Sequence, residues 1–253
     1  MSSFSIVIVA KNAADKIGRL LESLSGLSDD VIICDTGSSD NTISIAQQAE
    51  AKVYSIRWEG CGKSKNAAIA FAKYDWILSL DSDEKIDPVM YKTLKQWQPA
   101  SEYSVYRVLW KTFLGEKWIR YGEWSGGWKN RLFNKKIVRW DYAIAHEDIT
   151  STHRLTYHKL PGYLEHYSFD DIKHYISKII HSAMITAQEY HNNGKKTFLI
   201  KMMFSPLFGF IKGYFLRLGF LDGYKGWIVA VTSAYYRFIK YARLYELNKK
   251  KKQ

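Results

Sequence analysis

The first hundred residues alternate between short apolar runs and segments with helical spacing. Four apolar runs bounded by polar residues predict buried strands, at 4–10, 31–35, 53–56 and 76–80. Helices are expected between them, over 14–24, 43–50 and 64–73. Asn12 and Asp15 are expected to cap the first helix. Because strand and helix alternate with short links, the pattern predicts a parallel sheet covered by helices on both faces.

The alternation of strands and helices stops after residue 98, at the end of one more expected helix. Asp87 and Pro88 predict the start of a helix over 88–96, and β-type runs follow at 103–110, 129–133 and 137–140. The pair Pro161-Gly162 is expected to end this part. Three helices are then expected, over 170–192, 197–221 and 224–247. We therefore predict an α/β domain over 1–165, with a first half at 1–98 and a second at 99–165, and a C-terminal helical region over 166–253.

Composition indicates which partners and which cellular compartment suit the chain. The 253 residues carry a formal net charge of +12, and 15% of them are aromatic. A basic surface attracts nucleic acid, anionic lipid or phosphorylated glycan. The two cysteines, Cys34 and Cys61, form no disulfide framework, which favours a reducing cytosol.

The segment 197–221 is the candidate for membrane contact. It places Phe, Leu, Ile and Met at helical spacing, interleaved with Lys201, Lys212 and Arg217. No run of 18 uncharged apolar residues exists, so a spanning helix is not expected. Such a helix either lies in the plane of a membrane interface or packs against the sheet domain, since amphipathicity fits both. A basic tail at 249–252 adds attraction to an anionic surface.

Three carboxylates follow the fourth predicted strand, at Asp81, Asp83 and Glu84. In α/β sheets, ligands bind just beyond the carboxyl ends of the strands. Acids crowded there repel one another unless a cation lies between them, and magnesium takes one or two carboxylates together with substrate phosphates. The alternative is an acidic loop that caps the next helix.

Two further groups stand at the same predicted edge. Asp35 ends the second strand and can accept a hydrogen bond from a base or ribose, or it can simply cap its turn. Lys65 and Asn66 open a helix, where a cation and amides favour phosphate. The sequence 60–64 is not a P-loop, because Arg57 stands where the first glycine is required.

The second half offers aromatic and acidic candidates. Trp124 and Trp128 flank a glycine-rich stretch and present flat faces to sugar rings, unless they pack inside a hairpin. Arg131 follows and suits a carboxylate or phosphate. The cluster His146-Glu147-Asp148 offers carboxylates for proton transfer.

In this order and spacing, the motifs resemble those of family 2 glycosyltransferases. The match is carried by segments 5–12, 31–42, 65–68 and 81–84. Within that family the chain is most similar to bacterial lipopolysaccharide core glucosyltransferases that act on inner-core heptose, through 124–133, 145–147 and 219–223. Ser82 departs from the family pattern, where a small apolar residue is common. So does 125–127, where a proline or aspartate is usual.

The resemblance implies the GT-A fold: a Rossmann-like, mostly parallel central sheet with helices on both faces, here with a C-terminal amphipathic helical extension. It also implies an inverting, metal-dependent transfer of glucose from UDP-glucose to a lipid-linked oligosaccharide. The enzyme would be cytoplasmic, on the cytoplasmic face of an anionic inner membrane.

Residue roles follow from the same resemblance. Mg²⁺ or Mn²⁺ would be bound by Asp83, with Asp81 holding the donor ribose or a metal-bound water. Glu147 would be the catalytic base, and Asp148 is the second choice. The remaining residues would bind the donor (Asp35, Lys11, Lys65, Asn66) or the acceptor (Trp124, Trp128, Arg131).

Two other function classes compete. A nucleotidyltransferase also uses an α/β sheet with metal-binding acids, but it needs a glycine-rich basic loop after the first strand, and 11–14 contains no glycine. A nucleic-acid-binding module is suggested by the net charge alone. Its aromatic residues would interleave with Lys and Arg in a recognisable motif, which is absent, so no nucleic-acid partner is expected.

Overall fold

The computed structural model describes residues 3–142, 148–169 and 172–250. The chain folds into two compact units. The first contains Met1–Trp110 and Gly127–His166, and the second contains Lys111–Gly126 and Tyr167–Gln253. Segment 111–126, which lies in the second half of the predicted α/β domain, therefore groups with the C-terminal helices.

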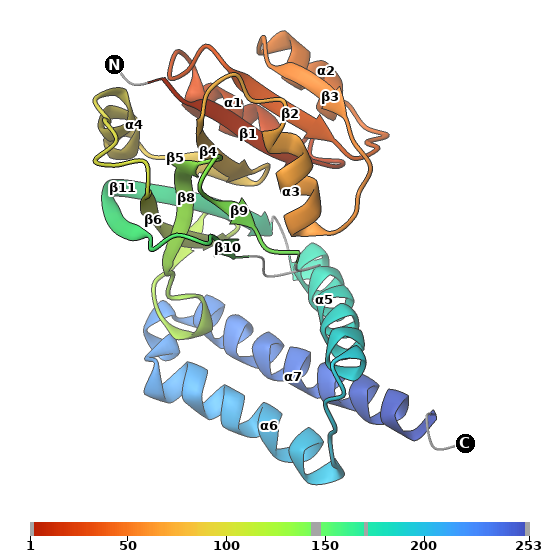
Figure 1. The fold of residues 1–253 in the computed structure, drawn as a ribbon. Coiled ribbons are helices and arrows are strands. Elements are labelled where there is room, and N and C mark those ends of the chain that lie inside the picture. The colour runs from red at the N-terminus through yellow and green to blue at the C-terminus, as the bar shows by residue number, and fades with distance from the viewer. Residues whose placement is uncertain (1–2, 143–147, 170–171, 251–253) are drawn as a thin grey trace. The chain divides into compact units, whose positions relative to one another are not determined.

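The first unit is built on a mixed sheet (Figure 1). Its strands among the described residues have the order β3-β2-β1-β4-β8-β6-β11-β5. The four N-terminal strands are parallel, as predicted, whereas β8 pairs antiparallel with β4 and β6, and β11 pairs antiparallel with β5. The strands are β1 (Ser5–Ala10), β2 (Val31–Asp35), β3 (Lys52–Ser55), β4 (Trp76–Asp81), β5 (Glu84–Ile86), β6 (Ser104–Leu114), β8 (Trp128–Asn134) and β11 (Thr156–Phe169).

Two hydrophobic clusters cover the two faces of this sheet. Alternate residues of a strand point to opposite faces, so Ile6 and Ile8 join one cluster and Val7 joins the other. The first cluster includes α1 (Ile17–Leu24), part of α2 (Thr42–Gln48) and α4 (Pro88–Lys95); the second includes α3 (Cys61–Ile69). The short pair β9 (Arg139–Trp140) and β10 (Ile149–Thr150) forms a separate ladder.

Strand β11 corrects the sequence prediction, which ended the strand region at Pro161-Gly162. Both residues lie inside this strand. Gly162 adopts φ +95°, and a Cβ there would lie 2.3 Å from the backbone nitrogen of Met90 at the start of α4. Glycine therefore lets β11 pass close to α4, whose N-cap is Asp87 as predicted, with Asp87 Oδ1 accepting from Met90 N at 2.8 Å.

Among the described residues, the second unit contains helices, the short strand β7 (Lys117–Ile119) and the ends of β6 and β11. Helices α5 (Ile172–Asn192) and α6 (Leu199–Ile211) both pack against α7 (Tyr224–Lys250) (Figure 1). Strand β7 pairs with the end of β6, and short turns complete the unit: η1 (Gly122–Trp124), η2 (Lys212–Leu216) and η3 (Gly219–Asp222). Within the described residues, one helical stretch, Leu199–Leu216, is long and apolar enough to cross a membrane, and 11% of it is buried.

A buried carboxylate fixes the turn that precedes η1. Asp222 is 3% exposed, and its Oδ2 accepts from the backbone amides of Arg120 and Tyr121 at 3.0 and 2.9 Å. Glu123 nearby pairs with Arg217 and Arg237, each at 3.3 Å. The segment 111–126 is thereby tied to the helices by charge-assisted hydrogen bonds as well as by packing.

Candidate active site

Asp81 ends β4 at the carboxyl edge of the parallel strands and is held by two cations. Lys65 Nζ lies 2.7 Å from Asp81 Oδ1, and Arg131 Nη2 lies 2.7 Å from Asp81 Oδ2. Burial raises the pKa of Asp81, but the charges of Arg131 and Lys65 outweigh that effect and bring it well below its usual range. Its side chain is 31% exposed, so the edge presents an ionised carboxylate to solvent.

Glu84 lies beside Asp81 and is buried, with 1% of the residue exposed. Its Oε1 accepts from Trp110 Nε1 at 2.7 Å and from Arg131 Nη2, and its Oε2 accepts from the backbone amide of Asp81 at 2.8 Å. Burial raises the pKa of Glu84 to about 7, even though Arg131 opposes the shift. Through these buried hydrogen bonds, Glu84 holds the end of β4 and the Arg131 side chain in place.

A β-bulge explains why Arg131 reaches these acids. Strand β8 pairs Leu132 with Tyr106 and Asn130 with Arg107, which leaves Arg131 without an opposite residue on β6. Bulges re-aim a side chain and are frequent beside active sites. Here the re-aimed guanidinium is 4% exposed and contacts both Asp81 and Glu84. Its charge is turned to the acids, whereas the sequence assigned Arg131 to the acceptor.

Asp83 is accompanied by a histidine that sequence reasoning did not select. His166 Nε2 lies 3.3 Å from Asp83 Oδ1, and the His166 ring stacks on Trp110 with centroids 4.2 Å apart. The register of β11 on β5, which places His166 opposite Glu84, brings the two together. No spacing signal links residues 83 positions apart in the chain, and the strand that carries His166 was not predicted.

The donor set fits a divalent cation. Carboxylate oxygen and imidazole nitrogen are ligands that Mn²⁺ and related ions accept. Over the residues the structure describes, no group of three or more His, Cys, Asp and Glu side chains is arranged to hold a metal ion. Asp83 and His166 would be two of the ligands of such a cation.

The loops after β1 and β2 are joined by hydrogen bonds. Asn12 N donates to Ser38 Oγ and Asn12 Oδ1 accepts from Ser39 N, both at 2.8 Å. Asn12 adopts φ +47° and does not cap α1, which has no side-chain cap, so the predicted cap is wrong. The polar groups of Asn12 instead form the hydrogen bonds that join the two loops, which fixes the shape of this edge of the sheet.

Asp35 lies in that loop pair and is 3% exposed. Its carboxylate accepts from the amides of Gly37 and Ser38 at 2.9 and 3.0 Å and from the Ser38 hydroxyl. Burial raises its pKa, but these hydrogen bonds outweigh burial and lower it overall. The contacts are those of a turn cap. Three of the roughly four acceptor positions of the carboxylate are therefore occupied.

The other residues assigned to donor binding are placed differently from one another. Lys65 is 7% exposed and faces Asp81, with its ammonium 4.8 Å from the Trp140 ring centroid. The side-chain amide of Asn66 is hydrogen-bonded to the backbone of Trp140. Its Nδ2 donates to the Trp140 carbonyl at 2.8 Å, and its Oδ1 accepts from the Trp140 amide at 3.0 Å. Lys11 is exposed.

The two tryptophans assigned to the acceptor also differ. Trp128, at the start of β8, is 38% exposed, and Lys159 lies 4.8 Å from its ring centroid. Trp124, in the other unit, packs edge-on against Tyr175 at 4.9 Å and joins the hydrophobic cluster of the helices. Of the two, Trp128 keeps a ring face available to a ligand.

The acidic cluster at 146–148 is described only in part, because His146 and Glu147 lie outside the described residues. Asp148 is exposed and lies just before β10. Its Oδ1 accepts from Asn130 Nδ2 at 2.9 Å and from the amide of Ile149 at 2.8 Å. These bonds give Asp148 a role in holding the β10 start against β8.

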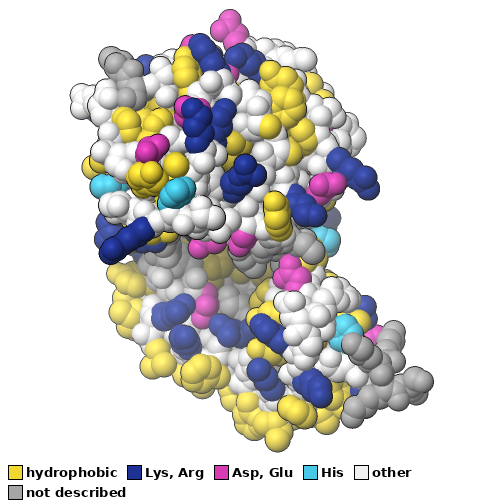
Figure 2. All heavy atoms as spheres, viewed as in Figure 1, with side chains coloured by type: hydrophobic (Ala, Val, Ile, Leu, Met, Phe, Trp, Pro, Cys, Tyr) yellow, Lys and Arg dark blue, Asp and Glu magenta, His cyan; other side chains and the backbone are white. Residues whose placement is uncertain are grey.

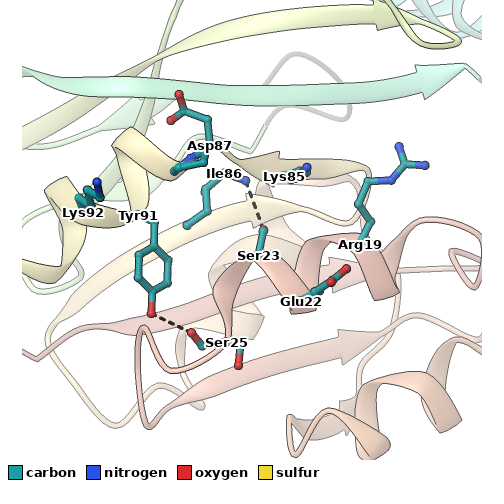
Figure 3. A pocket seen from close by; sticks show the side chains of 10 residues that line it. Arg19, Glu22, Ser23, Ser25, Lys85, Ile86, Asp87, Tyr91 and Lys92 are labelled. Atoms are coloured by element: carbon teal, nitrogen blue, oxygen red, sulfur yellow. Dashed lines mark hydrogen bonds between the residues drawn. The ribbon is translucent and has the colours of Figure 1, made fainter.

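A separate hollow lies between α1 and the segment from β5 to α4 (Figure 3). Its volume is about 520 Å³. Tyr91 Oη donates to the Ser25 carbonyl at 2.9 Å, and Ile86 N donates to Ser23 Oγ at 3.3 Å across it. Its lining includes none of Lys65, Asp81, Asp83, Glu84 and Arg131, so it is distinct from the candidate active site.

Comparison with known proteins decides the family. The sequence profile of Glycosyl transferase family 2 matches residues 5–154, which is more than half of the chain. The chain belongs to glycosyltransferase family 2. It is therefore a glycosyltransferase with the GT-A fold, as the sequence predicted, although its sheet as a whole is mixed. Family membership decides against the nucleotidyltransferase and the nucleic-acid module as its class.

Relatives in the family match over nearly the whole chain. An uncharacterized glycosyltransferase of Rickettsia bellii is 27% identical, with 96% of this chain and 86% of the relative covered. The lipopolysaccharide core biosynthesis glycosyltransferase LpsC of Rhizobium meliloti is 26% identical, with 96% and 92% covered.

Among solved structures, glucosyl-3-phosphoglycerate synthase of Mycobacterium tuberculosis, in complex with Mn²⁺, UDP and glucosyl-3-phosphoglycerate, is 26% identical. The match covers 45% of this chain and 44% of that one, with a TM-score of 0.35.

Proposed function

We propose that this glycosyltransferase moves a sugar, glucose from UDP-glucose, onto an inner-core heptose of lipopolysaccharide or lipooligosaccharide, with inversion at the anomeric carbon. One observation carries the proposal: Asp81 and Asp83 stand at the strand end of a family 2 domain with Lys65, Arg131 and His166 directed at them. The similarity to LpsC, named for lipopolysaccharide core biosynthesis, supports the acceptor class.

In this proposal the buried cations prepare the acids. Lys65 and Arg131 hold Asp81 ionised, and Glu84 fixes Arg131 from behind. Asp83 and His166 would hold the divalent cation, which would supply positive charge for the diphosphate leaving group. Asp81 would hold the donor ribose or a metal-bound water. Asp35 contacts the uracil or the ribose through its remaining acceptor position, and Lys11 lies on the loop beside it.

Proton transfer falls to Glu147 in this proposal. The acceptor hydroxyl oxygen forms the new bond to the anomeric carbon while the bond from that carbon to the diphosphate oxygen breaks. The hydroxyl proton passes to the Glu147 carboxylate, and UDP leaves as an anion. General base catalysis of this kind contributes roughly 10²–10⁴-fold. Asp148 is the weaker choice because its carboxylate is engaged with Asn130. Trp128 offers its exposed ring to the acceptor sugar.

The helical unit fits an enzyme that works at a membrane surface. Exposed apolar side chains follow one stripe of α7 at helical spacing, at Trp227, Val231, Tyr235 and Phe238. Those of α6 include Ile200, Met203, Phe204, Leu207 and Ile211. Figure 2 shows hydrophobic side chains of this unit with Lys and Arg between them. Patches of this extent mark interaction surfaces.

The same helices favour lying in the interface plane over crossing the bilayer. The stretch Leu199–Leu216 contains Lys201, Lys212 and Pro206, and its last turn is a π-helix. Helix α6 also packs along α7, which carries several Lys and Arg residues. An in-plane helix keeps these cations at the headgroups.

The test is transfer from a panel of UDP-sugars to truncated core lipid in the presence of Mn²⁺. We expect product formation with UDP-glucose, a product mass increased by one hexose, and linkage to a core heptose. A Glu147→Gln protein that still binds UDP should lose at least about 100-fold in turnover, whereas Asp148→Asn should lose much less. Unchanged turnover in Glu147→Gln would remove the base assignment, and transfer of a different sugar would replace the donor.

A further inference from the structure

A second group of cations gathers within the helical unit. Lys240, on the C-terminal half of α7, is 9% exposed. Its ammonium lies 5.1 Å from the ring centroid of Tyr190, 5.2 Å from that of Tyr236 and 4.9 Å from that of Tyr241. Within the part of the chain that the structure describes, the Lys240 ammonium forms no hydrogen bond or ion pair, and its partners are aromatic faces.

Two more lysines share these rings. Lys195 Nζ lies 3.9 Å from the Tyr190 centroid, and Lys201 Nζ lies 5.1 Å from the Tyr241 centroid. Since Lys240 and Lys195 lie 5.1 and 3.9 Å from one centroid, their ammonium groups are at most 9.0 Å apart. The cluster draws on the loop after α5, the start of α6 and the end of α7, so the fold brings the three cations together.

The environment of Lys240 carries several positive charges. Burial lowers the pKa of Lys240, and Arg237, Lys201 and Lys195 lower it further, while no acid among the described residues offsets them. Arg237 itself is paired with Glu123. On an ordinary solvated face, long cationic side chains spread apart along apolar surface. Here one of them is nine-tenths buried, and two others are directed to the same rings.

The cluster adjoins an apolar hollow. Its volume is about 550 Å³, and Lys201 lines it together with Phe198, which precedes α6, and with Ile200, Phe204, Ser205 and Phe208 on α6. Phe198, Ile200, Phe204 and Phe208 are each at least 60% exposed. An anion that binds the lysines therefore meets apolar surface on one side, which is the chemistry of an amphiphile. Ammonium groups each offer three donors to phosphate oxygens in charge-assisted hydrogen bonds.

We propose that Lys195, Lys201 and Lys240 form a binding site for the phosphate group of an anionic membrane lipid, whose acyl chains lie along the apolar face of α6. The inference rests on the membrane association proposed above and adds a specific headgroup site to it. The three tyrosine rings position the lysines, and Lys240, the buried member, gives the site its selectivity.

The test is sedimentation of the full chain with phosphatidylcholine vesicles that contain either no phosphatidylglycerol or about 30% of it. We expect the wild-type protein to bind the anionic vesicles at least about fivefold more tightly, the factor that one lysine near an anionic leaflet contributes. Lys240→Met keeps the length and apolar stem of the side chain and should lose most of that preference. Phosphatidylcholine binding should stay within about twofold.

Lys173→Met is the matched control. Lys173 is an exposed lysine on the same helix as Tyr190, 17 residues earlier, which is about 25 Å along the axis. The Lys173→Met substitution removes one positive charge outside the cluster, so the preference for anionic vesicles should stay within about twofold of wild type. If Lys240→Met unfolds, Lys195→Gln/Lys201→Gln, which changes two exposed side chains, should reduce the preference by a similar factor.

Equal binding of wild type and Lys240→Met to anionic vesicles, or equal losses in Lys240→Met and Lys173→Met, would overturn the proposal. Displacement from anionic vesicles by about 10 mM soluble glycerol phosphate would assign the site to free phosphates and overturn the lipid. Metal-dependent UDP binding, measured without vesicles, should be unchanged in Lys240→Met. UDP binding tests the glycosyltransferase proposal independently of the lipid site, so either proposal can fail without affecting the test of the other.

Discussion

Replacing Arg131 by Met tests the internal support of the active site. The guanidinium is 4% exposed and bonds to Asp81 at 2.7 Å and to Glu84. Met fills similar volume but leaves two neighbouring carboxylates without their shared cation. Removing one member of a buried ion pair typically costs about 3–5 kcal/mol of unfolding free energy. Asp81 keeps Lys65 and is partly exposed, so most of this cost falls on Glu84.

The pH dependence of this cost has a definite sign. The folded pKa of Glu84 is about 7 already, above its unfolded value near 4.3, and losing Arg131 raises it further. A raised carboxyl pKa contributes stability at low pH that is lost as pH rises through the folded pKa. The destabilisation of Arg131→Met should therefore be smaller at pH 6 than at pH 8, because the protonated Glu84 needs no cation.

Urea unfolding at pH 6 and pH 8 measures the destabilisation by Arg131→Met and its pH dependence. The Glu84→Gln protein and the double variant complete a double-mutant cycle. Glu84→Gln removes the buried charge, so in its presence Arg131→Met should cost at least about 1.5 kcal/mol less than alone at pH 8. The reasoning would be refuted by an Arg131→Met protein within about 1 kcal/mol of wild type at pH 8. Additive single changes in the cycle would refute it equally.

Two further predictions concern buried groups of the first unit. Asp30 is fully buried and accepts from Ser5 Oγ, Lys52 Nζ and one backbone amide; burial raises its pKa, but these bonds lower it overall. Its stabilisation is present above the unfolded pKa and is lost as pH falls through the folded pKa. Asp30→Asn should therefore cost about 2–4 kcal/mol at pH 7 and less at pH 3 in urea unfolding; equal costs at both pH values would contradict this. Burial raises the pKa of Cys34 to about 12, so iodoacetamide at pH 8 should leave Cys34 unmodified in the folded protein and modify it in urea, as read by peptide mass. Rapid alkylation of native Cys34 would show that β2 is accessible.

The parallel half of the sheet could be predicted from the sequence because each strand is a short apolar run between polar residues. Residues such as Ile6, Ile8 and Ile33 are all fully buried in the structure, as their apolar runs predict. The acids after Leu80 could be placed for the same reason, since the end of a parallel strand fixes the edge they reach. Hydrophobic pattern alone was sufficient there.

The rest depends on contacts that no local pattern encodes. Strand β11 contains Pro161 and Gly162, which ordinarily end a strand, and the close approach of Gly162 to Met90 is a tertiary fact. The direction of Arg131 follows from a one-residue bulge in β8. Asn12 was assigned to a helix cap, yet its side chain bonds across to Ser39 on another loop. His166 reaches Asp83 through strand register alone.

The central claim is that the acids after β4 bind a nucleotide diphosphate through a cation, and calorimetric titration of UDP tests it most directly. The wild-type protein should bind UDP at least tenfold more tightly with Mn²⁺ than with EDTA, and Asp83→Asn should bind weakly under both conditions. Asp75→Asn, which removes an acid paired with Lys136 on the surface, should behave as wild type. Binding of UDP that ignores Mn²⁺, or an Asp83→Asn protein with the wild-type Mn²⁺ response, would contradict the account.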